Sequence, residues 1–410
     1  MARISIIGAG ITGVTTAYSL AVRGHEVTVY DRRRYPAMVT SFANGGQLSA
    51  SNAEVWNSWA TIAKGMRWLL KNDAPLLLNL KPGLHKYGWL AEFCGNIFRH
   101  ERNTIATVRL ALDARRHMFT IAEAEGIDFD LKRCGILHLY HNEQEFRAAE
   151  VGNALLLKGG LERHAVSAGE MRAIEPSLQG ALHAGFFTPG DATGDIHKFT
   201  RGLADACARR GVIFKFGAAV RRVEIQNRIC TISLTDDESG RPIASQTADA
   251  IVVCAGVESR EIARKLGEKV NIYPVKGYSI TVNLRDEQSR TAAPSVSLLD
   301  DAAKIVTSRL GPDRFRVAGT AEFNGFNLDI RADRIRPLLR WSERLFPKMD
   351  TDSVTPWAGL RPMTPDMLPV VRPGRVRGVY YNTGHGHLGW TLSAATAEMI
   401  AMRLDSDFAA

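Results

Sequence analysis

Gly8-Ala9-Gly10-Ile11-Thr12-Gly13 is a glycine-rich stretch near the start of the chain, and its surroundings are typical of a nucleotide-binding turn. The apolar run that ends at Ile7 predicts a strand, and apolar residues at helical spacing follow the glycines as far as Gly24. A second apolar run then ends in Asp31. Strand, glycine turn, helix and a second strand with a terminal acid form a dinucleotide-binding unit. We therefore predict an α/β fold with a Rossmann-like domain.

Each residue of this unit has a distinct physical role. Gly8 allows the tight turn, Gly10 lets the backbone approach a pyrophosphate, and Gly13 lets helix and strand pack closely. The helix N-terminus offers free N–H groups to phosphates. Asp31 is placed to accept hydrogen bonds from a ribose, which argues against a 2′-phosphate although basic residues follow it directly.

A second glycine-rich turn near the other end of the chain, residues 382–391, is of the strand-to-helix kind that closes over a flavin ring. Between the two turns, residues 250–256 read as a parallel strand buried on both faces, whereas residues 279–282 and 315–319 read as strands of a separate sheet. We therefore expect a discontinuous cofactor domain with an inserted mixed-sheet substrate domain. The predicted segments are 1–85, 195–272 and 355–410 for the first domain, and 86–194 and 273–354 for the second.

Composition narrows the class of protein. The 410 residues suffice for two domains, and 45% hydrophobic and 23% charged residues are ordinary for a globular enzyme. The net charge of +9 is dispersed, which favours a solvated basic surface over a nucleic-acid site. Five separated cysteines without a CxxC suit a reducing compartment and give no metal framework. Because the first strand begins at once and no run of 18 apolar residues occurs, a cytoplasmic protein is expected.

One segment, residues 56–81, mixes tryptophan, leucine and methionine with lysine and arginine. An interfacial membrane segment has this composition, and peripheral contact with the inner face of the cell membrane would follow from it. A buried helix pair with a polar outer face has the same pattern, so both interpretations remain open.

Four stretches together make the chain similar to a known family: residues 41–47, 274–279, 357–366 and 382–391. With the first glycine turn and Asp31, they resemble the FAD-dependent D-amino acid oxidase superfamily from Met1 to about Arg403, and within it the bacterial D-amino acid dehydrogenases. The resemblance implies non-covalent FAD. It places the glycine turn at the pyrophosphate, Asp31 at the ribose, the Val220 backbone at the adenine and residues 384–388 at the flavin ring. The implied cofactor contacts are Gly8, Gly10, Ile11, Thr12, Gly13, Asp31, Arg32, Ser41, Asn44, Gly46, Gln47, Leu48, Val220, Ala255, Gly256, Gly384, His385, Gly386, His387 and Leu388.

The resemblance also implies substrate contacts. Arg361 matches the arginine that grips the substrate carboxylate, a task that suits a planar guanidinium fork. Tyr278 is a candidate second contact, although an ordinary strand tyrosine fits equally. His387 would direct its backbone carbonyl toward the substrate amine, which we favour over an acid–base role. His385 and His387 have no further ligand cluster around them in the sequence, so no metal is expected.

The implied reaction is oxidative deamination of a D-amino acid to a 2-oxo acid and ammonia, by hydride transfer to flavin N5. Electrons would pass to a quinone or dye acceptor. One alternative is a related flavin enzyme for cyclic or N-substituted amino acids such as D-hydroxyproline, sarcosine or glycine. Another is a non-catalytic FAD-binding subunit that relays electrons.

Overall fold

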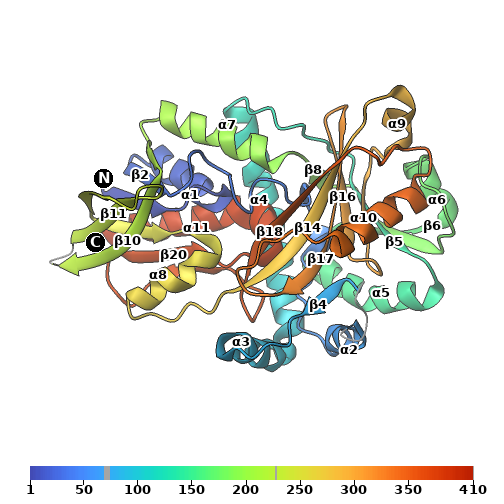
Figure 1. Ribbon diagram of the computed structural model, residues 1–410, viewed down its shortest axis with the longest axis horizontal. Helices are drawn as coiled ribbons and strands as arrows, with labels where there is room; N and C mark the ends of the chain where they lie inside the picture. Colours follow the sequence, from blue (N-terminus) through green and yellow to red (C-terminus); the bar gives the residue numbers. More distant parts are fainter. Residues whose placement is uncertain (69–73, 227–228, 410) are drawn as a thin grey trace.

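A computed structural model describes residues 1–68, 74–226 and 229–409. Two bodies lie side by side along the long axis of the molecule, each built on its own sheet (Figure 1). Both chain termini lie on the side of the smaller sheet (Figure 1).

The smaller sheet has six strands in the order β19-β20-β13-β1-β2-β9. All neighbours are parallel except β19, which is antiparallel to β20. The central strand β13 is buried along its whole length between two parallel neighbours, as predicted. Its strands are β1 (Arg3–Ile7), β2 (Glu26–Asp31), β9 (Ile213–Phe216), β13 (Ala250–Val253), β19 (Val370–Pro373) and β20 (Val379–Thr383).

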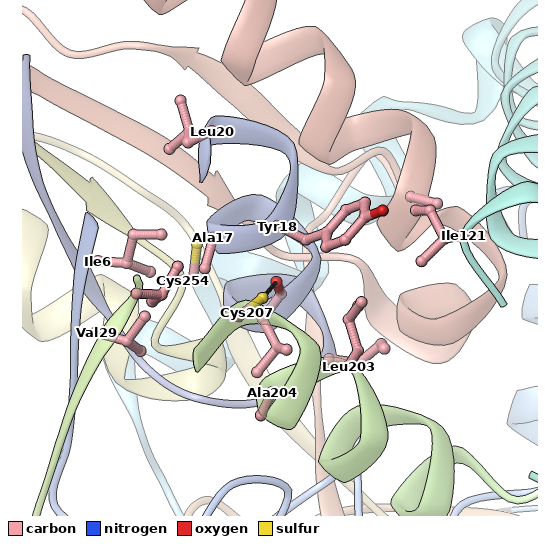
Figure 2. Close-up of a cluster of buried hydrophobic side chains, with 14 of the residues drawn as sticks. Ile6, Ala17, Tyr18, Leu20, Val29, Ile121, Leu203, Ala204, Cys207 and Cys254 are labelled. Atoms are coloured by element: carbon pink, nitrogen blue, oxygen red, sulfur yellow. Dashed lines mark hydrogen bonds between the residues drawn. The ribbon is translucent and has the colours of Figure 1, made fainter. Parts of the chain in front are cut away.

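Helices cover one face of this sheet and a small sheet covers the other. Helix α1 (Ile11–Val22) packs on β1 and β2, and α4 (His100–Ala124), α7 (Ile196–Arg209) and α11 (Gly389–Ala409) pack around it. Figure 2 shows this core, in which Ile6, Ala17 and Leu203 meet from strand, α1 and α7. The opposite face carries β10 (Ala218–Gln226), β11 (Ile229–Asp236) and β12 (Pro242–Ala248), with α8 (Ser259–Lys265). Tight packing on both faces holds the glycine turn rigidly.

The larger sheet has nine strands in the order β18-β14-β17-β16-β15-β5-β7-β6, with β4 also pairing β17. It is mixed, since β15 runs parallel to β5 and β4 parallel to β17 while the other pairs are antiparallel. Its strands are β4 (Leu76–Leu78), β5 (Ile136–Tyr140), β6 (His164–Ser167), β7 (Ala184–Thr188), β14 (Tyr273–Asn283), β15 (Ser297–Asp300), β16 (Ile305–Leu310), β17 (Arg314–Phe323) and β18 (Val354–Met363).

Shorter elements surround the larger sheet. Helix α10 (Ala332–Leu345) packs its apolar side on β14 and β17. Around the rest lie α2 (Trp59–Trp68), α3 (Leu84–Gly95), α5 (Glu143–Lys158), α6 (Ala168–Ile174) and α9 (Glu287–Ala292). A two-stranded ladder of β3 (Gln47–Leu48) and β8 (Ala192–Thr193) lies apart from both sheets.

Strand pairing departs from the predicted domain boundaries at two points. Strand β18, whose residues 355–363 were assigned to the cofactor domain, extends the larger sheet by pairing along β14. Strand β4 lies in the predicted segment 1–85 but pairs with β17. Both pairings join residues far apart in sequence, and the proline and glycine residues of β18 hide its strand pattern.

Candidate functional site

A cavity of about 1190 Å³ runs between the two sheets and is lined by both glycine-rich turns. Segments of both bodies form the cavity wall, including residues around 41–56, the middle of β14 and Arg361 on β18. The arrangement therefore brings the cofactor motif and the candidate substrate residues to one enclosed space.

The first turn requires glycine for steric reasons. Gly8 has φ +108°, and a Cβ there would lie 2.6 Å from the carbonyl oxygen of Cys254. A Cβ on Gly13 would lie 1.8 Å from the carbonyl oxygen of Gly8. Such contacts exclude any side chain, so the backbone itself forms the surface at the start of α1, where a phosphate would meet N–H groups.

Polar side chains hold the turn in place. The Asp31 carboxylate accepts hydrogen bonds from the backbone N–H of Ala9 at 2.7 Å and of Arg33 at 2.8 Å. Ser41 Oγ accepts from the N–H of Ile11 at 3.0 Å. Asp31 therefore braces the turn from the end of β2 while it lines the cavity, where a ribose hydroxyl can reach it.

Nearly all implied cofactor contacts line the cavity. Two do not: Gly13 serves the packing of α1, and Leu48 is buried opposite Ala192 in the two-stranded ladder. Arg32 lines the cavity and pairs with Glu258 beside it. The lining members are Gly8, Gly10, Ile11, Thr12, Asp31, Arg32, Ser41, Asn44, Gly46, Gln47, Val220, Ala255, Gly256, Gly384, His385, Gly386, His387 and Leu388.

In the second turn, His385 is an anchor. Gly384 and Gly386 have φ values of +74° and +59°, which carry the chain sharply from β20 toward α11. His385 Nε2 lies 2.9 Å from Thr396 Oγ1 of α11, and burial lowers its pKa to about 3. The buried imidazole, bonded to α11, therefore holds the turn in place.

His387 has a free acceptor nitrogen. Its Nε2 lies 3.2 Å from the carbonyl oxygen of Asn52, and because that oxygen only accepts, Nε2 carries the proton. Nδ1 is then an acceptor, and it has no hydrogen-bond partner among the described residues. The ring stacks on Trp56 at 4.6 Å between centroids. Burial, with a smaller contribution from the positive charge of Arg361, lowers its pKa to about 4.

Arg361 occupies a space made by a bulge in the sheet. Residues 320 and 321 of β17 face the single residue Gly277 of β14, and Thr320 adopts φ +60°. The Thr320 carbonyl accepts from Arg361 Nη1 at 3.0 Å, and a Cβ on Gly277 would lie 2.4 Å from the guanidinium. Burial lowers the pKa of Arg361 to about 10. Within the described chain no carboxylate forms an ion pair with it.

Tyr278 lines the cavity, but its hydroxyl belongs to a buried network. It donates to Glu322 Oε2 at 2.6 Å, and Lys276 Nζ lies 3.3 Å from Glu322 Oε1. Lys276 and Glu322 are both buried, and burial raises the pKa of Tyr278. The tyrosine hydroxyl is therefore engaged within the protein, and the side chain is buried in the core that packs against α10.

Other residues at the cavity were not singled out from the sequence. Buried Asp191 accepts from the N–H groups of Ala50 and Ser51, each at 3.0 Å, and pairs with Arg115 at 3.0 Å. This bonding holds the segment that carries the Asn52 carbonyl. Arg163 also lines the cavity. Single residues of this kind have no motif around them, so no sequence signal marks them.

Comparison with known proteins agrees with this geometry. The model of the family described as FAD dependent oxidoreductase matches residues 3–403. The chain belongs to this family. It is 58% identical over 409 residues to D-amino acid dehydrogenase 3 of Mesorhizobium japonicum, covering 99% of this chain and 98% of that protein. It is 40% identical over 411 residues to D-amino acid dehydrogenase of Dechloromonas aromatica, covering 98% and 97%.

Solved structures show the same fold at low sequence identity. Glycine oxidase from Geobacillus kaustophilus has a TM-score of 0.77 at 21% identity, covering 99% of this chain and 95% of that one. L-proline dehydrogenase from P. horikoshii has a TM-score of 0.74 at 18% identity, covering 99% and 93%. As a member of the FAD-dependent oxidoreductases, the chain uses FAD, and a cavity lined by side-chain-free turns fits that cofactor.

Proposed function

We propose that this protein is an FAD-dependent D-amino acid dehydrogenase, which converts D-amino acids to 2-oxo acids and ammonia. The names of its relatives at 58% and 40% identity support the substrate class. The observation that carries the proposal is the enclosed Arg361, which has no ion pair in the described chain. FAD supplies the redox chemistry by accepting a hydride from the substrate.

Arg361 binds the substrate carboxylate in this proposal. An enclosed guanidinium without a counter-ion is unfavourable, as its lowered pKa indicates, and an incoming carboxylate removes that penalty. The contact with the Thr320 carbonyl through Nη1 fixes the plane of the fork. A two-point contact then fixes the substrate's orientation, which is the main contribution a protein makes to such a step.

His387 binds the substrate amine. The resemblance implies its backbone carbonyl as an acceptor, and the unpartnered Nδ1 offers a side-chain acceptor. An amino acid presents its amine one carbon from its carboxylate, so neighbouring acceptor and guanidinium suit the two groups. With a pKa of about 4, the imidazole is neutral at pH 7 and adds no charge that would repel an ammonium. Orientation, rather than strong basicity, is its role.

Anaerobic reduction of the bound flavin tests the proposal directly. The holoenzyme is mixed with D- and L-amino acids, glycine, sarcosine, D-proline and D-hydroxyproline, and the flavin absorbance is followed. Bleaching by primary D-amino acids at higher kcat/KM than by the other compounds is expected. Preference for the cyclic or N-substituted compounds would favour a related amine dehydrogenase, and no bleaching by any of them would favour an electron-relay subunit.

We further propose that helix α2 contacts an anionic membrane surface, where a quinone takes the electrons. None of its residues is buried, and Trp59 and Met66 are 68% and 63% exposed beside Lys64 and Arg67. This favours the interfacial interpretation over the buried helix pair. Residues 69–71 of the same sequence pattern lie outside the described residues. Within the described part of the chain, no helix has the length and apolar character needed to cross a bilayer.

A further inference from the structure

Polar side chains of β5 and α5 also line the cavity. In the ribbon view these two elements lie far from β1 and α1, which carry the first glycine turn (Figure 1). His138 and Tyr140 of β5, Asn153 of α5 and Arg163, which precedes β6, line this part of the cavity. None of these residues belongs to the implied cofactor or substrate contacts. Arg163 thus places a second guanidinium in the same cavity as Arg361.

Arg163 is buried with unused hydrogen-bonding capacity. Its exposed fraction is only 8%, and its guanidinium lies over the Phe186 ring at 4.6 Å. Nε and Nη2 have no hydrogen-bond partner among the described residues, whereas Nη1 makes a long contact of 3.4 Å with Asn153 Oδ1 and the guanidinium also interacts with the Tyr140 hydroxyl. A buried donor set left in this state is costly unless a ligand completes it.

The nearby acids do not compensate this charge. Asp191 is engaged by Arg115 and two backbone N–H groups. Asp301 pairs with Lys64 and Lys304, and Glu54 lies 3.2 Å from His100. Arg163 forms no ion pair within the described ranges, and burial lowers its pKa even though Tyr140, Asp191 and Glu54 act in the opposite direction. Positive potential therefore remains in this part of the cavity.

This part of the cavity is close to the position proposed for the substrate. Ser51 Oγ lies 2.9 Å from His138 Nε2, and the carbonyl of the next residue, Asn52, meets His387. Consecutive Cα atoms are about 3.8 Å apart, so the two histidines are held by one short piece of backbone. The charge of Lys304 acts on both, while that of Arg163 acts on His138 and that of Arg361 on His387. Arg163 therefore lies near His138, and Arg361 near His387, with the Ser51–Asn52 segment between the two histidines.

We propose that Arg163 is a second carboxylate-binding position, which takes the acidic group at the end of the substrate's side chain. This rests on the proposed function and deepens it, since it makes acidic D-amino acids the preferred substrate class. With Arg361 on the main carboxylate, the substrate's two acidic ends are each matched by a guanidinium fork. The Phe186 ring, over which the Arg163 guanidinium lies, helps to hold that fork in place.

The contribution of Arg163 to substrate preference is tested by comparing each acidic substrate with its neutral amide. kcat/KM is determined for D-aspartate, D-glutamate and D-2-aminoadipate, with D-asparagine and D-glutamine as neutral isosteres and D-alanine as reference. In the wild type, the acidic substrate of matching length should have a kcat/KM roughly tenfold to a hundredfold higher than that of its amide. This is the effect expected of one charge-assisted contact. R163M should bring that ratio near one, and R163K should restore part of the preference for the acid.

R147M is the matched control, because Arg147 is an exposed arginine of α5 that pairs only with Glu143. It should keep the wild-type ratio. Equal acid-to-amide ratios in wild type and in a folded, FAD-loaded R163M would overturn the inference. So would a wild type that discriminates against acids.

A binding measurement separates this inference from the proposed function. Glutarate and butyrate are titrated into the holoenzyme, and the perturbation of flavin absorbance is followed. Tighter binding of glutarate that is lost in R163M supports the second position even if no D-amino acid reduces the flavin. Absence of that preference contradicts it even if D-alanine is oxidised well. Should R163M lose FAD, R163K and R163Q carry the comparison.

Discussion

At the scale of single residues, the position of the Arg361 guanidinium depends on two neighbours, Gly277 and Thr320. Arg361 fits because Gly277 has no side chain and because Thr320 takes a left-handed conformation that turns its carbonyl to Nη1. A non-glycine residue in that region is strained, and such strain is found where function requires it. Two inconspicuous residues therefore determine where the guanidinium lies.

Removing the guanidinium should impair substrate oxidation without loss of the cofactor. R361L should lower kcat/KM for D-amino acids by roughly a thousandfold, because removing one partner of a buried charge pair costs about 2–5 kcal/mol. R361K should recover only part, since an ammonium lacks the planar fork. Stopped-flow flavin reduction measures this. Oxidation by R361L at a rate near that of the wild type would place the carboxylate elsewhere.

Filling the space at Gly277 should act through Arg361. In G277A the new Cβ would lie 2.4 Å from the guanidinium, which must move and lose the Thr320 contact. We expect a fall in kcat/KM of roughly tenfold to a hundredfold, as for misplacement of a substrate-orienting group. The exposed strand position Ile243→Ala serves as control. Wild-type kinetics in G277A would show that the position of Arg361 is not critical.

Asp31 should matter for FAD and not for substrate choice. D31A removes the acceptor for the Ala9 and Arg33 N–H groups and the expected ribose contact. FAD affinity should drop by roughly tenfold to a hundredfold, given about 1.5–3 kcal/mol for a charge-assisted hydrogen bond. Equilibrium dialysis of FAD measures it, and D31N provides a milder change. Unchanged affinity in D31A would exclude Asp31 from cofactor binding.

At the scale of elements, the sequence predicts what local periodicity determines. β1, α1 and β2 were expected because their apolar spacing and glycines lie within thirty or so residues, as is usual for such a unit. No strand was predicted around Arg361, because the pairing of β18 with β14 joins residues far apart in sequence. Nδ1 of His387 is left as an acceptor because Nε2 bonds to the carbonyl of Asn52, which is distant in sequence. The surroundings of Arg163 likewise come from separate elements, with Asn153 on α5 and Phe186 on β7. No pattern along the chain contains such contacts.

Helix α2 should contribute to membrane binding if its exposed apolar residues insert into the membrane–water interface. The double variant W59S/M66S should bind anionic vesicles roughly a hundredfold more weakly, since each large apolar side chain contributes about 1.5–3 kcal/mol when fully buried and every 1.4 kcal/mol is about tenfold in affinity. Co-sedimentation with phosphatidylglycerol vesicles measures this. M402S, which changes an exposed methionine of α11, is the control. Equal sedimentation of all three proteins would contradict an interfacial α2.

At the scale of the whole molecule, the two bodies meet around a cavity whose wall contains several buried, neutral histidines. His138, His385 and His387 all have a lowered pKa, chiefly because burial disfavours the charged ring. Each must therefore gain a proton when the chain unfolds at mildly acidic pH. Stability of the entire fold is thereby coupled to pH through residues that hold the second glycine turn and the segment at 51–52.

The sign of this coupling follows from the pKa values. The pKa of His385 is about 3 when folded and about 6.5 when unfolded. Between those values the unfolded chain binds more protons, so the free energy of unfolding rises with pH. The contribution is complete above pH 6.5 and is lost as the pH falls toward the folded pKa of about 3, at about 1.4 kcal/mol per pH unit for one such histidine.

Replacing His385 should flatten this dependence. H385Q puts a neutral amide near Thr396 and removes one titrating group, so its unfolding free energy should change by about 1 kcal/mol less per pH unit between pH 6 and 4 than that of the wild type. Urea denaturation with saturating FAD measures both proteins. H164Q changes an exposed histidine on β6, and it should retain the wild-type slope. If H385Q and the wild type lose stability in parallel over this range, protonation of His385 does not limit the acid stability of the fold, and the acid-induced loss comes from other titrating groups, such as His138, His387 or the carboxylates.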